Sequence, residues 1–165
     1  HIAGYIQDAW KSAILVVNKW DLIEKDERTS IEFENQIRRQ LNFLPYVPVL
    51  FISAATGQRV HTVLPMVKKV QEERLRKLST SQLNRILHNA QDVHQLSSGT
   101  GKPFRIYYGT QVRSEPPTFL LYCNNPKSGH FTYMRFLENQ IRKEEPFLGT
   151  PIRIILKKRE REEDR

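Results

Sequence analysis

The sequence contains a single cysteine, has no apolar run of 18 residues or more and carries no signal peptide. We therefore expect a soluble, cytoplasmic protein without disulfides or membrane helices. Cys123 lies in the apolar run 119–123, where packing in a core is a more common role than catalysis. The five histidines show no spacing typical of a metal site, so we predict no bound metal ligand set in this chain.

Acidic residues are scarce in the second half of the chain. The whole sequence has a net charge of +8. Residues 1–78 carry 12 basic and 9 acidic side chains (+3), residues 79–159 carry 12 and 5 (+7), and residues 160–165 carry 2 and 4 (−2). This excess of positive charge favours a polyanionic partner for residues 79–159, and simple solubility is the alternative.

An apolar run at residues 14–17 is followed by Asn18-Lys19-Trp20-Asp21. The run is typical of a strand buried on both faces in a parallel sheet. The tetrapeptide has the NKxD pattern by which GTPases recognise guanine. Asp21 would accept bonds from the N1–H and the N2 amino group, Asn18 would bond the opposite edge of the base and tie neighbouring loops together, and the stem of Lys19 would lie along the purine. A solvated turn capped by Asp21 is the alternative for this motif alone.

A second apolar run, residues 47–52, ends in Ser53-Ala54-Ala55. This loop is similar to the SAK-type loop of GTPases, in which backbone N–H groups after the serine bond guanine O6. A donor at that place rejects adenine, because the adenine N6 amino group is itself a donor. One helix separates the two runs, so the spacing fits a βαβ unit with both loops at one sheet edge. The two loops together predict guanine-nucleotide ancestry.

The phosphate-binding half of a GTPase is absent. No G-x-x-x-x-G-K-[ST] motif occurs, and the stretch that comes nearest has Leu96 in place of its first glycine and Pro103 in place of the metal-binding hydroxyl. No D-x-x-G loop precedes the NKxD motif. Without a phosphate cradle, Mg²⁺ ligands or a water-positioning loop, we expect no GTP hydrolysis by this chain.

Hydrophobic periodicity predicts an α/β chain with two domains and a charged tail. Residues 1–78 should form the C-terminal half of a doubly wound domain, with helices at 1–10, 31–44 and 60–78 and strands at 12–17 and 47–52. Residues 79–159 should form an α-β-β-α-β domain with a three-stranded sheet and helices on one face. Its helices are expected at 79–93 and 130–145 and its strands at 105–113, 118–124 and 151–156. We expect the chain to be frayed from Lys157 onward, and residues 160–165 form the tail.

The two guanine loops, followed by a basic α-β-β-α-β module, resemble the carboxyl end of the bacterial EngA/Der double-GTPase family. Shared phrases are Ile106-Tyr107-Tyr108-Gly109-Thr110-Gln111-Val112, Pro116-Pro117-Thr118-Phe119, Arg135-Phe136-Leu137-Glu138-Asn139 and Gly149-Thr150-Pro151-Ile152-Arg153.

The resemblance covers nearly the whole chain. It implies the end of a second, Ras-like G domain at 1–78 and a KH-like domain at 79–159. It further implies GTP or GDP with Mg²⁺ in the intact, monomeric protein, and a role in assembly of the large ribosomal subunit. Expected partners are ribosomal RNA and the first G domain of the same chain, with no membrane partner.

Basic side chains are the candidate RNA contacts. KH domains clamp RNA with a GXXG loop, but this sequence has only Gly99-Thr100-Gly101, so we expect the contacts to come from side chains instead. For each of them an ordinary solvated face is the alternative. Tyr107, Tyr108 and Tyr122 could stack on bases, although tyrosines in strands more often lie in a core. The basic candidates are Lys102, Arg105, Arg113, Lys127, Arg153, Lys157, Lys158 and Arg159.

Two hypotheses of different classes follow from these residues. The first is part of a ribosome-assembly GTPase whose KH-like domain docks on ribosomal RNA or on its own G domains. The second is a non-catalytic interaction module, in which the basic domain senses the nucleotide state by packing on a neighbouring G domain without binding RNA.

Overall fold

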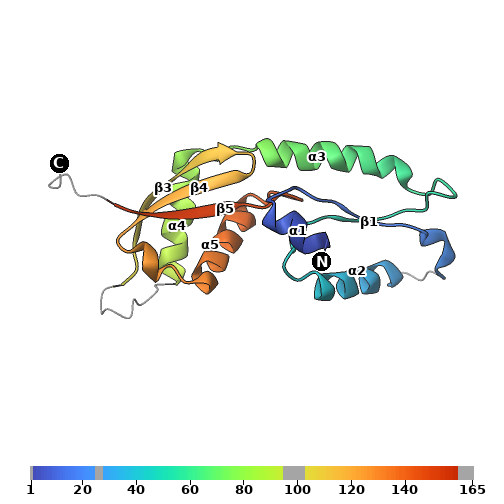
Figure 1. Cartoon of the computed structure of the whole chain (residues 1–165), viewed down its shortest axis with the longest axis horizontal. Coiled ribbons are helices and arrows are strands. Elements are labelled where there is room, and N and C mark those ends of the chain that lie inside the picture. The colour runs from blue at the N-terminus through green and yellow to red at the C-terminus, as the bar shows by residue number, and fades with distance from the viewer. Residues whose placement is uncertain (1, 25–27, 95–102, 160–165) are drawn as a thin grey trace. The chain divides into compact units, whose positions relative to one another are not determined.

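The computed structural model describes residues 2–24, 28–94 and 103–159, and these fall into two compact units (Figure 1). Unit 1 comprises residues 1–74 and 147–151, and unit 2 comprises residues 75–146 and 152–165. Each unit is built around its own sheet, of two strands in unit 1 and three in unit 2. The predicted α/β class is therefore confirmed. No helix among the described residues is long and apolar enough to cross a membrane.

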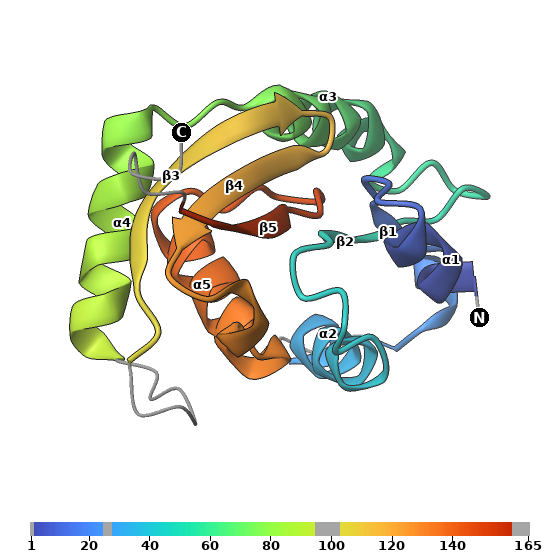
Figure 2. The same cartoon turned by 60° about the vertical axis from the view of Figure 1, so that its left-hand side comes forward.

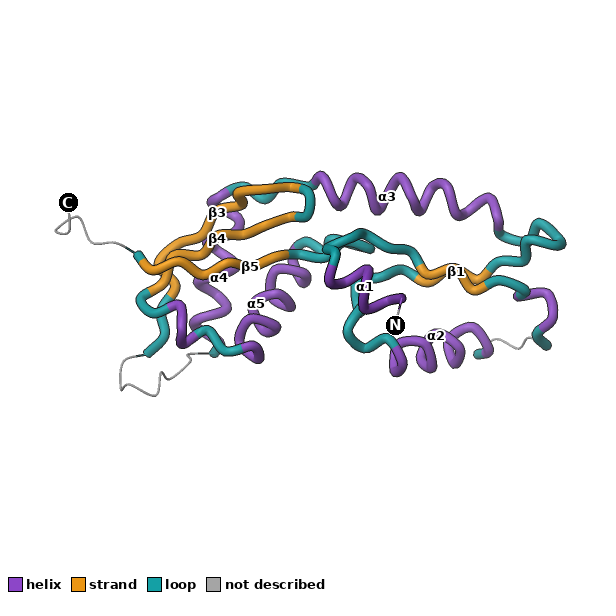
Figure 3. Tube along the Cα trace, viewed as in Figure 1, coloured by secondary structure: helices purple, strands orange, loops and turns teal. Residues whose placement is uncertain are grey.

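Unit 1 is built on a two-stranded parallel sheet, as the sequence predicts. Strand β1 (Leu15–Val17) lies beside β2 (Val49–Phe51), with Val16 opposite Leu50. The helices are α1 (Ile2–Asp8), α2 (Thr29–Gln40) and α3 (Val63–Leu75), and 3-10 turns cover Trp20–Leu22 and Val60–Thr62. The strands of unit 1 are shorter than those of unit 2 (Figure 3).

Several predictions for unit 1 overestimate the burial or the length of its elements. Val16 is 39% exposed, so β1 is not buried on both faces. Its only partner strand among the described residues is β2. The predicted helix 31–44 ends at Gln40, and turns then lead to Pro45. Of the predicted strands 12–17 and 47–52, only the last three residues of the first and the central part of the second are paired. At the second of these, Pro48 has no N–H to give to a ladder, although its carbonyl accepts a bond from the Leu15 N–H (2.9 Å).

Segment Phe147–Pro151 follows the last helix of unit 2 in sequence but folds with unit 1. The Gly149 N–H donates to the Tyr46 carbonyl (2.7 Å), and the Gly149 carbonyl accepts from the Ala13 N–H (2.8 Å). A side chain at position 149 would collide with Val70, and the backbone there has φ +68°, so both packing and conformation favour glycine. Phe147 is fully buried. The segment thus contributes both hydrogen bonds and apolar packing to unit 1.

Unit 2 has the predicted α-β-β-α-β order. Its helices are α4 (Thr80–Val93) and α5 (Phe131–Glu144), and its strands are β3 (Ile106–Ser114), β4 (Pro117–Cys123) and β5 (Arg153–Lys158). The sheet order is β3-β4-β5, antiparallel between β3 and β4 and parallel between β4 and β5. Both helices cover the same face of the sheet (Figure 2). A 3-10 turn at Pro126–Ser128 leads from β4 towards α5.

The core of unit 2 lies between the helices and one face of the sheet. Alternate residues of β4 point into it, namely Phe119, Leu121 and Cys123, and none of them is exposed. The predicted core role of Cys123 is confirmed, and burial raises the pKa of its thiol. Gly109 on β3 allows close packing, since an added Cβ would lie 2.5 Å from a Leu121 methyl carbon.

Helix α4 also closes the outer edge of the sheet. The side-chain amide of Asn84 accepts from the Gly109 N–H (2.8 Å) and donates to the Gly109 carbonyl (3.0 Å). Gln91 makes the same pair of bonds to Ile106, at 2.8 and 3.1 Å. These amides give β3 the hydrogen bonds that a further strand would otherwise supply, which protects the edge from pairing with another chain.

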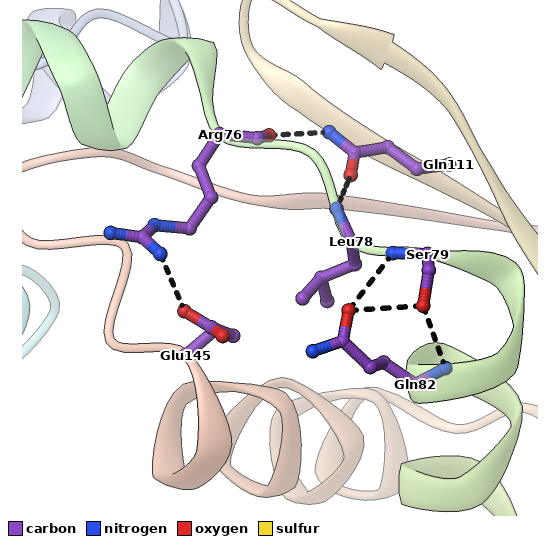
Figure 4. A network of polar contacts seen from close by, with 6 residues as sticks. All are labelled: Arg76, Leu78, Ser79, Gln82, Gln111 and Glu145. Carbon is purple, nitrogen blue, oxygen red and sulfur yellow. Dashed lines mark hydrogen bonds and ion pairs between the residues drawn. The ribbon is translucent and has the colours of Figure 1, made fainter.

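The connection into α4 is held by side chains, and it corrects the predicted helix 60–78. Helix α3 ends at Leu75 because the next peptide groups bind Gln111, which accepts from the Leu78 N–H (2.7 Å) and donates to the Arg76 carbonyl (2.9 Å) (Figure 4). Ser79 and Gln82 then form a capping box that begins α4, as the sequence suggests for Ser79.

The predicted fraying from Lys157 onward is also wrong for the described residues. Lys157 and Lys158 lie in β5 opposite Tyr122 and Cys123, and the Arg159 N–H donates to the Cys123 carbonyl (2.9 Å). Pairing with the full length of β4 therefore extends the strand through a charged sequence that composition alone assigns to a tail. The start of the strand shifts in the same direction, from residue 151 to Arg153.

Candidate functional site

The loops that follow β1 and β2 meet at the carboxyl ends of these parallel strands. The Asn18 side-chain oxygen Oδ1 accepts from the Ala54 N–H (3.0 Å) and from the Lys19 N–H (2.8 Å). The Trp20 N–H donates to the Ile52 carbonyl (3.0 Å). Asn18 therefore ties the two loops together, as expected from the sequence. Its Nδ2 atom has no partner among the described residues and is available as a donor.

Lys19 and Trp20 give the first loop its shape. Lys19 has φ +62°, a left-handed conformation that costs a residue with a Cβ about 1–2 kcal/mol. Trp20 is buried, with its ring 5.3 Å from that of Phe33 and 4.4 Å from that of Phe51. Sequence reasoning left Trp20 as the variable position of the motif, although a large aromatic residue there is a signal for an anchor. Asp21 lies in the exposed turn that follows this anchor.

Ser53 shapes the second loop from inside. Its side chain is buried, and its Oγ accepts from the Thr56 N–H (3.2 Å) while its own N–H donates to the Gln58 carbonyl (3.0 Å). The N–H of Ala54 is engaged by Asn18, whereas that of Ala55 has no partner among the described residues. Both alanines are exposed. Of the three predicted residues, Ala55 is thus the one with a backbone donor left for a ligand.

These groups suit a guanine base in chemistry. Guanine has acceptors at N7 and O6 and donors at N1 and N2, and the two loops offer the Asn18 amide nitrogen, the Ala55 N–H and the Asp21 carboxylate. The residues fit the base alone. No phosphate-binding motif occurs in the sequence, and the described residues contain no group of His, Cys, Asp or Glu that could hold a metal ion.

The predicted RNA contacts divide between two ends of the unit 2 sheet. Arg113 and Arg153 lie on either side of Thr118, at the start of β4. Three other basic residues lie at the opposite end of the sheet. Lys157 lies over the ring of Tyr122, and Arg105 and Arg159 both lie over the ring of Tyr107. Lys158 and Lys127 are exposed near the same end, in β5 and in the turn after β4, and Lys102 lies outside the described residues.

The three tyrosines of the sheet are not core residues. Tyr107 is 36% and Tyr108 is 43% exposed, and Tyr122 is half-buried. The core preference expected for strand tyrosines is therefore wrong here, because both helices lie on the other face of the sheet and nothing described covers this one. An irregularity of the β3–β4 register between Ile106 and Tyr108 makes Tyr107 an extra residue, which simple alternation cannot foresee.

Comparisons with known proteins show which family this sequence resembles. Residues 77–157 match the family described as the KH-domain-like, C-terminal part of EngA bacterial GTPase enzymes. A protein named GTPase Der from Lactobacillus johnsonii is 48% identical over 159 residues, which is 96% of this chain and 37% of the relative. GTPase Der from Caldanaerobacter subterraneus is 48% identical over 158 residues, which is 96% of this chain and 36% of the relative.

The chain belongs to the EngA/Der family. It spans about a third of the length of the EngA/Der relatives that it matches, since its share of them is 36–37%. A solved structure of Era in complex with MgGDPNP and nucleotides 1506–1542 of 16S ribosomal RNA was also matched, with 16% identity, 93% of this chain and 57% of that chain covered, and a TM-score of 0.34.

Proposed function

We propose that this chain is the C-terminal part of a cytoplasmic, monomeric GTP-binding protein that acts in assembly of the large ribosomal subunit. Unit 1 would hold the guanine base, and unit 2 would contact ribosomal RNA. The observation that supports this best is the bond from the Ala54 N–H to Asn18 Oδ1, because it brings two guanine-specificity loops into one site.

In the proposed complex the first loop contacts guanine at both edges of the base, and the second loop contacts O6. Asp21 accepts from N1–H and N2, the Asn18 amide nitrogen donates to N7, and the Ala55 N–H donates to O6. Adenine is rejected twice, since its N6 amino group meets the Ala55 donor and its N1 has no hydrogen for Asp21. The phosphates and Mg²⁺ of GTP would be held by other parts of the full-length protein, and this chain alone should neither hydrolyse GTP nor bind it tightly.

The test of base recognition is Asp21→Asn in a full-length protein that carries this chain. A charged hydrogen bond contributes about 1.5–3 kcal/mol, so GTP should bind about 10- to 150-fold more weakly. Xanthosine triphosphate should gain affinity, because an amide can donate to its O2. Calorimetry with both nucleotides measures the change, and Glu24→Gln in the same exposed loop is a charge-matched control. Unchanged GTP affinity in the Asp21 variant would remove the role proposed for this residue.

The basic residues at the end of β5 supply the proposed RNA contact. Lys157→Gln, Lys158→Gln and Arg159→Gln together should reduce the salt dependence of RNA binding, by about 0.7 in log–log slope for each single-strand phosphate that is no longer neutralised. Glutamine rather than deletion is the right change, since these residues lie in or next to a paired strand. Lys68→Gln, Lys69→Gln and Arg59→Gln in unit 1 remove the same charge as a control. An unchanged slope in the β5 variant would place the RNA contact elsewhere.

The alternative function, an interaction module that senses nucleotide state on a neighbouring G domain, predicts a different result. RNA would then bind with the same weak affinity before and after removal of the β5 charges, while association with a separate first G domain would weaken. Strands β3, β4 and β5 contain four basic residues and no acidic one, and this observation favours RNA over a protein surface of mixed charge.

A further inference from the structure

Three tyrosines gather at one end of the open face of the unit 2 sheet. The rings of Tyr108 and Tyr122 are stacked, with centroids 4.4 Å apart and planes 18° from parallel. One face of Tyr108 lies against Tyr122, but the residue is still 43% exposed, so it remains accessible to solvent. Tyr107 is next to it and also exposed. Exposed aromatic rings at this density on a sheet are a surface on which planar groups can stack.

Cations surround these rings. The guanidinium groups of Arg105 and Arg159 lie 5.8 and 5.0 Å from the centre of the Tyr107 ring, and the Lys157 ammonium lies 6.0 Å from that of Tyr122. No strand of this sheet contains an acidic residue. The cluster therefore presents aromatic faces and positive charge within one small area, and opposing charge is absent from the described strands.

We propose that this tyrosine–cation cluster, formed by Tyr107, Tyr108 and Tyr122 with Arg105, Lys157 and Arg159, binds single-stranded RNA by stacking unpaired bases. A base stacks on the free face of Tyr108, and the cations neutralise the phosphates on either side. The proposal rests on the proposed function, namely that unit 2 contacts RNA, and it names the form of RNA that this end of the sheet selects.

Single strands are selected because a ring can receive a base only if the face of that base is uncovered. In a duplex each base is already stacked on its neighbours, and a helix of A-form RNA offers a protein mainly phosphates and hydroxyl groups. Stacking is tolerant of sequence, since every base has an aromatic face. The cluster should therefore discriminate single strands from duplexes far more than it discriminates one sequence from another.

The test measures RNA binding to the chain of residues 1–165 by fluorescence anisotropy. The probes are a labelled RNA strand of about 12 nucleotides, within the range of common single-strand site sizes, and the same strand annealed to its complement. Tyr108→Leu should weaken single-strand binding by about 5- to 150-fold, the range found for removal of one stacking ring. Its salt slope should not change, because every cation that faces a phosphate is still present. Duplex binding should be weak and unaffected.

Two further variants separate the ring from other effects. Tyr108→Phe keeps the ring and should bind like the parent chain. Phe131→Leu removes an aromatic residue that is 74% exposed on α5, with the Arg135 guanidinium 5.7 Å from its ring, so it is an exposed ring beside a cation that lies outside the cluster. Its binding should also be unchanged. Crosslinking of RNA that contains 4-thiouridine should label the peptide with Tyr107 and Tyr108, and this measurement needs no variant at all.

The outcomes distinguish the stacking from the function on which it rests. Equal binding by Tyr108→Leu and the parent chain, or crosslinks confined to other peptides, would overturn the stacking proposal while the charge contacts of β5 stand. A parent chain that binds neither probe would overturn both and would leave the cluster as a contact surface for protein. An equal reduction of single-strand and duplex binding in Tyr108→Leu would also reject base stacking.

Discussion

The two units of this chain bury their apolar residues to very different degrees. Unit 2 has strands of six to nine residues, helices on one face and side-chain amides along its outer edge. Unit 1 has strands of three residues each, and neither α1 nor α2 has a buried residue, whereas α4 buries four residues and α5 three. Each Å² of apolar surface that folding removes from water stabilises the folded state by about 25 cal/mol. Unit 2, which has the larger apolar core, should therefore be the more stable of the two. Similar numbers of residues thus yield unequal cores.

The two units also differ in where their side-chain hydrogen bonds lie. In unit 2 the edge of β3 is closed by Asn84 and Gln91, so its sheet is complete within the unit. In unit 1 the bond between Asn18 and Ala54 links the two loops that follow the strands, and Arg74 and segment Phe147–Pro151 make further long-range polar contacts. The candidate guanine loops therefore sit on the less stable unit, and low local stability is common in segments that bind ligands.

The largest expected effect is a separation of two unfolding transitions in urea. Trp10 and Trp20 both lie in unit 1, whereas Cys123 lies in the core of unit 2, so tryptophan fluorescence and thiol labelling report different units. Fluorescence should change at lower urea than the concentration at which Cys123 becomes reactive. Coincident transitions would show that the chain unfolds as one cooperative body and would contradict the comparison.

Phe147→Ala should destabilise unit 1, although the helix that precedes this residue, α5, belongs to unit 2. The side chain is fully buried, and truncation of such a phenylalanine costs about 3–5 kcal/mol. The fluorescence midpoint should fall and the labelling midpoint of Cys123 should stay. Phe131→Ala, at an exposed position of α5, should move neither. A shift of the labelling midpoint alone would assign Phe147 to the other unit.

Gly109→Ala should have the reverse pattern at smaller size. The added Cβ would lie 2.5 Å from a Leu121 carbon and 2.9 Å from a Leu87 carbon, and overpacking of this kind costs about 1–3 kcal/mol. The labelling midpoint of Cys123 should fall while fluorescence is unchanged. Gly4→Ala is the matched control, because a Cβ there meets nothing within 4 Å. Wild-type stability in the Gly109 variant would show that the sheet and α4 can move apart at no cost.

The smallest effect concerns pH. Burial raises the pKa of Tyr133 on α5, so the folded chain keeps this proton where the unfolded chain has begun to lose it. The contribution to stability is complete below about pH 10 and falls as pH rises beyond that, by at most about 1.4 kcal/mol per pH unit. Urea titrations followed by circular dichroism should show a shallower fall for Tyr133→Phe. Tyr5→Phe, at an exposed site, should behave like the parent chain, and identical slopes for all three would refute the argument.

Local patterns in the sequence predicted the parallel β1–β2 pair, the α-β-β-α-β order and the meeting of the two loops. They did so because apolar periodicity and motif spacing are local properties that tertiary packing here reinforces. The misses are non-local. Helix α3 stops because Gln111 binds the peptide groups beyond Leu75, and Lys157 joins a strand because β4 is long enough to pair with it.

The residues of the candidate site could be predicted from the sequence, but their individual roles could not. Asn18, Ser53 and their neighbours could be found from motif letters, but the division of labour among them depends on which N–H groups are already engaged. The exposure of Tyr107 and Tyr108 depends on a register irregularity and on helices that cover one face only. Both the free N–H groups and the exposed tyrosines are set by other parts of the fold, so the residues themselves do not predict them.

Segment Phe147–Pro151 has a consequence for how such chains can be recombined. A gene fusion that replaces residues 79–159 with the same stretch of a relative also replaces a piece of unit 1, since Gly149 must fit Val70 and Thr150 shares a hydrogen bond with Ser12 (3.0 Å). A donor whose segment does not match would import a poorly fitted core along with its basic sheet. Exchange of the basic module between members of the family is therefore constrained by a handful of residues that lie outside its sheet.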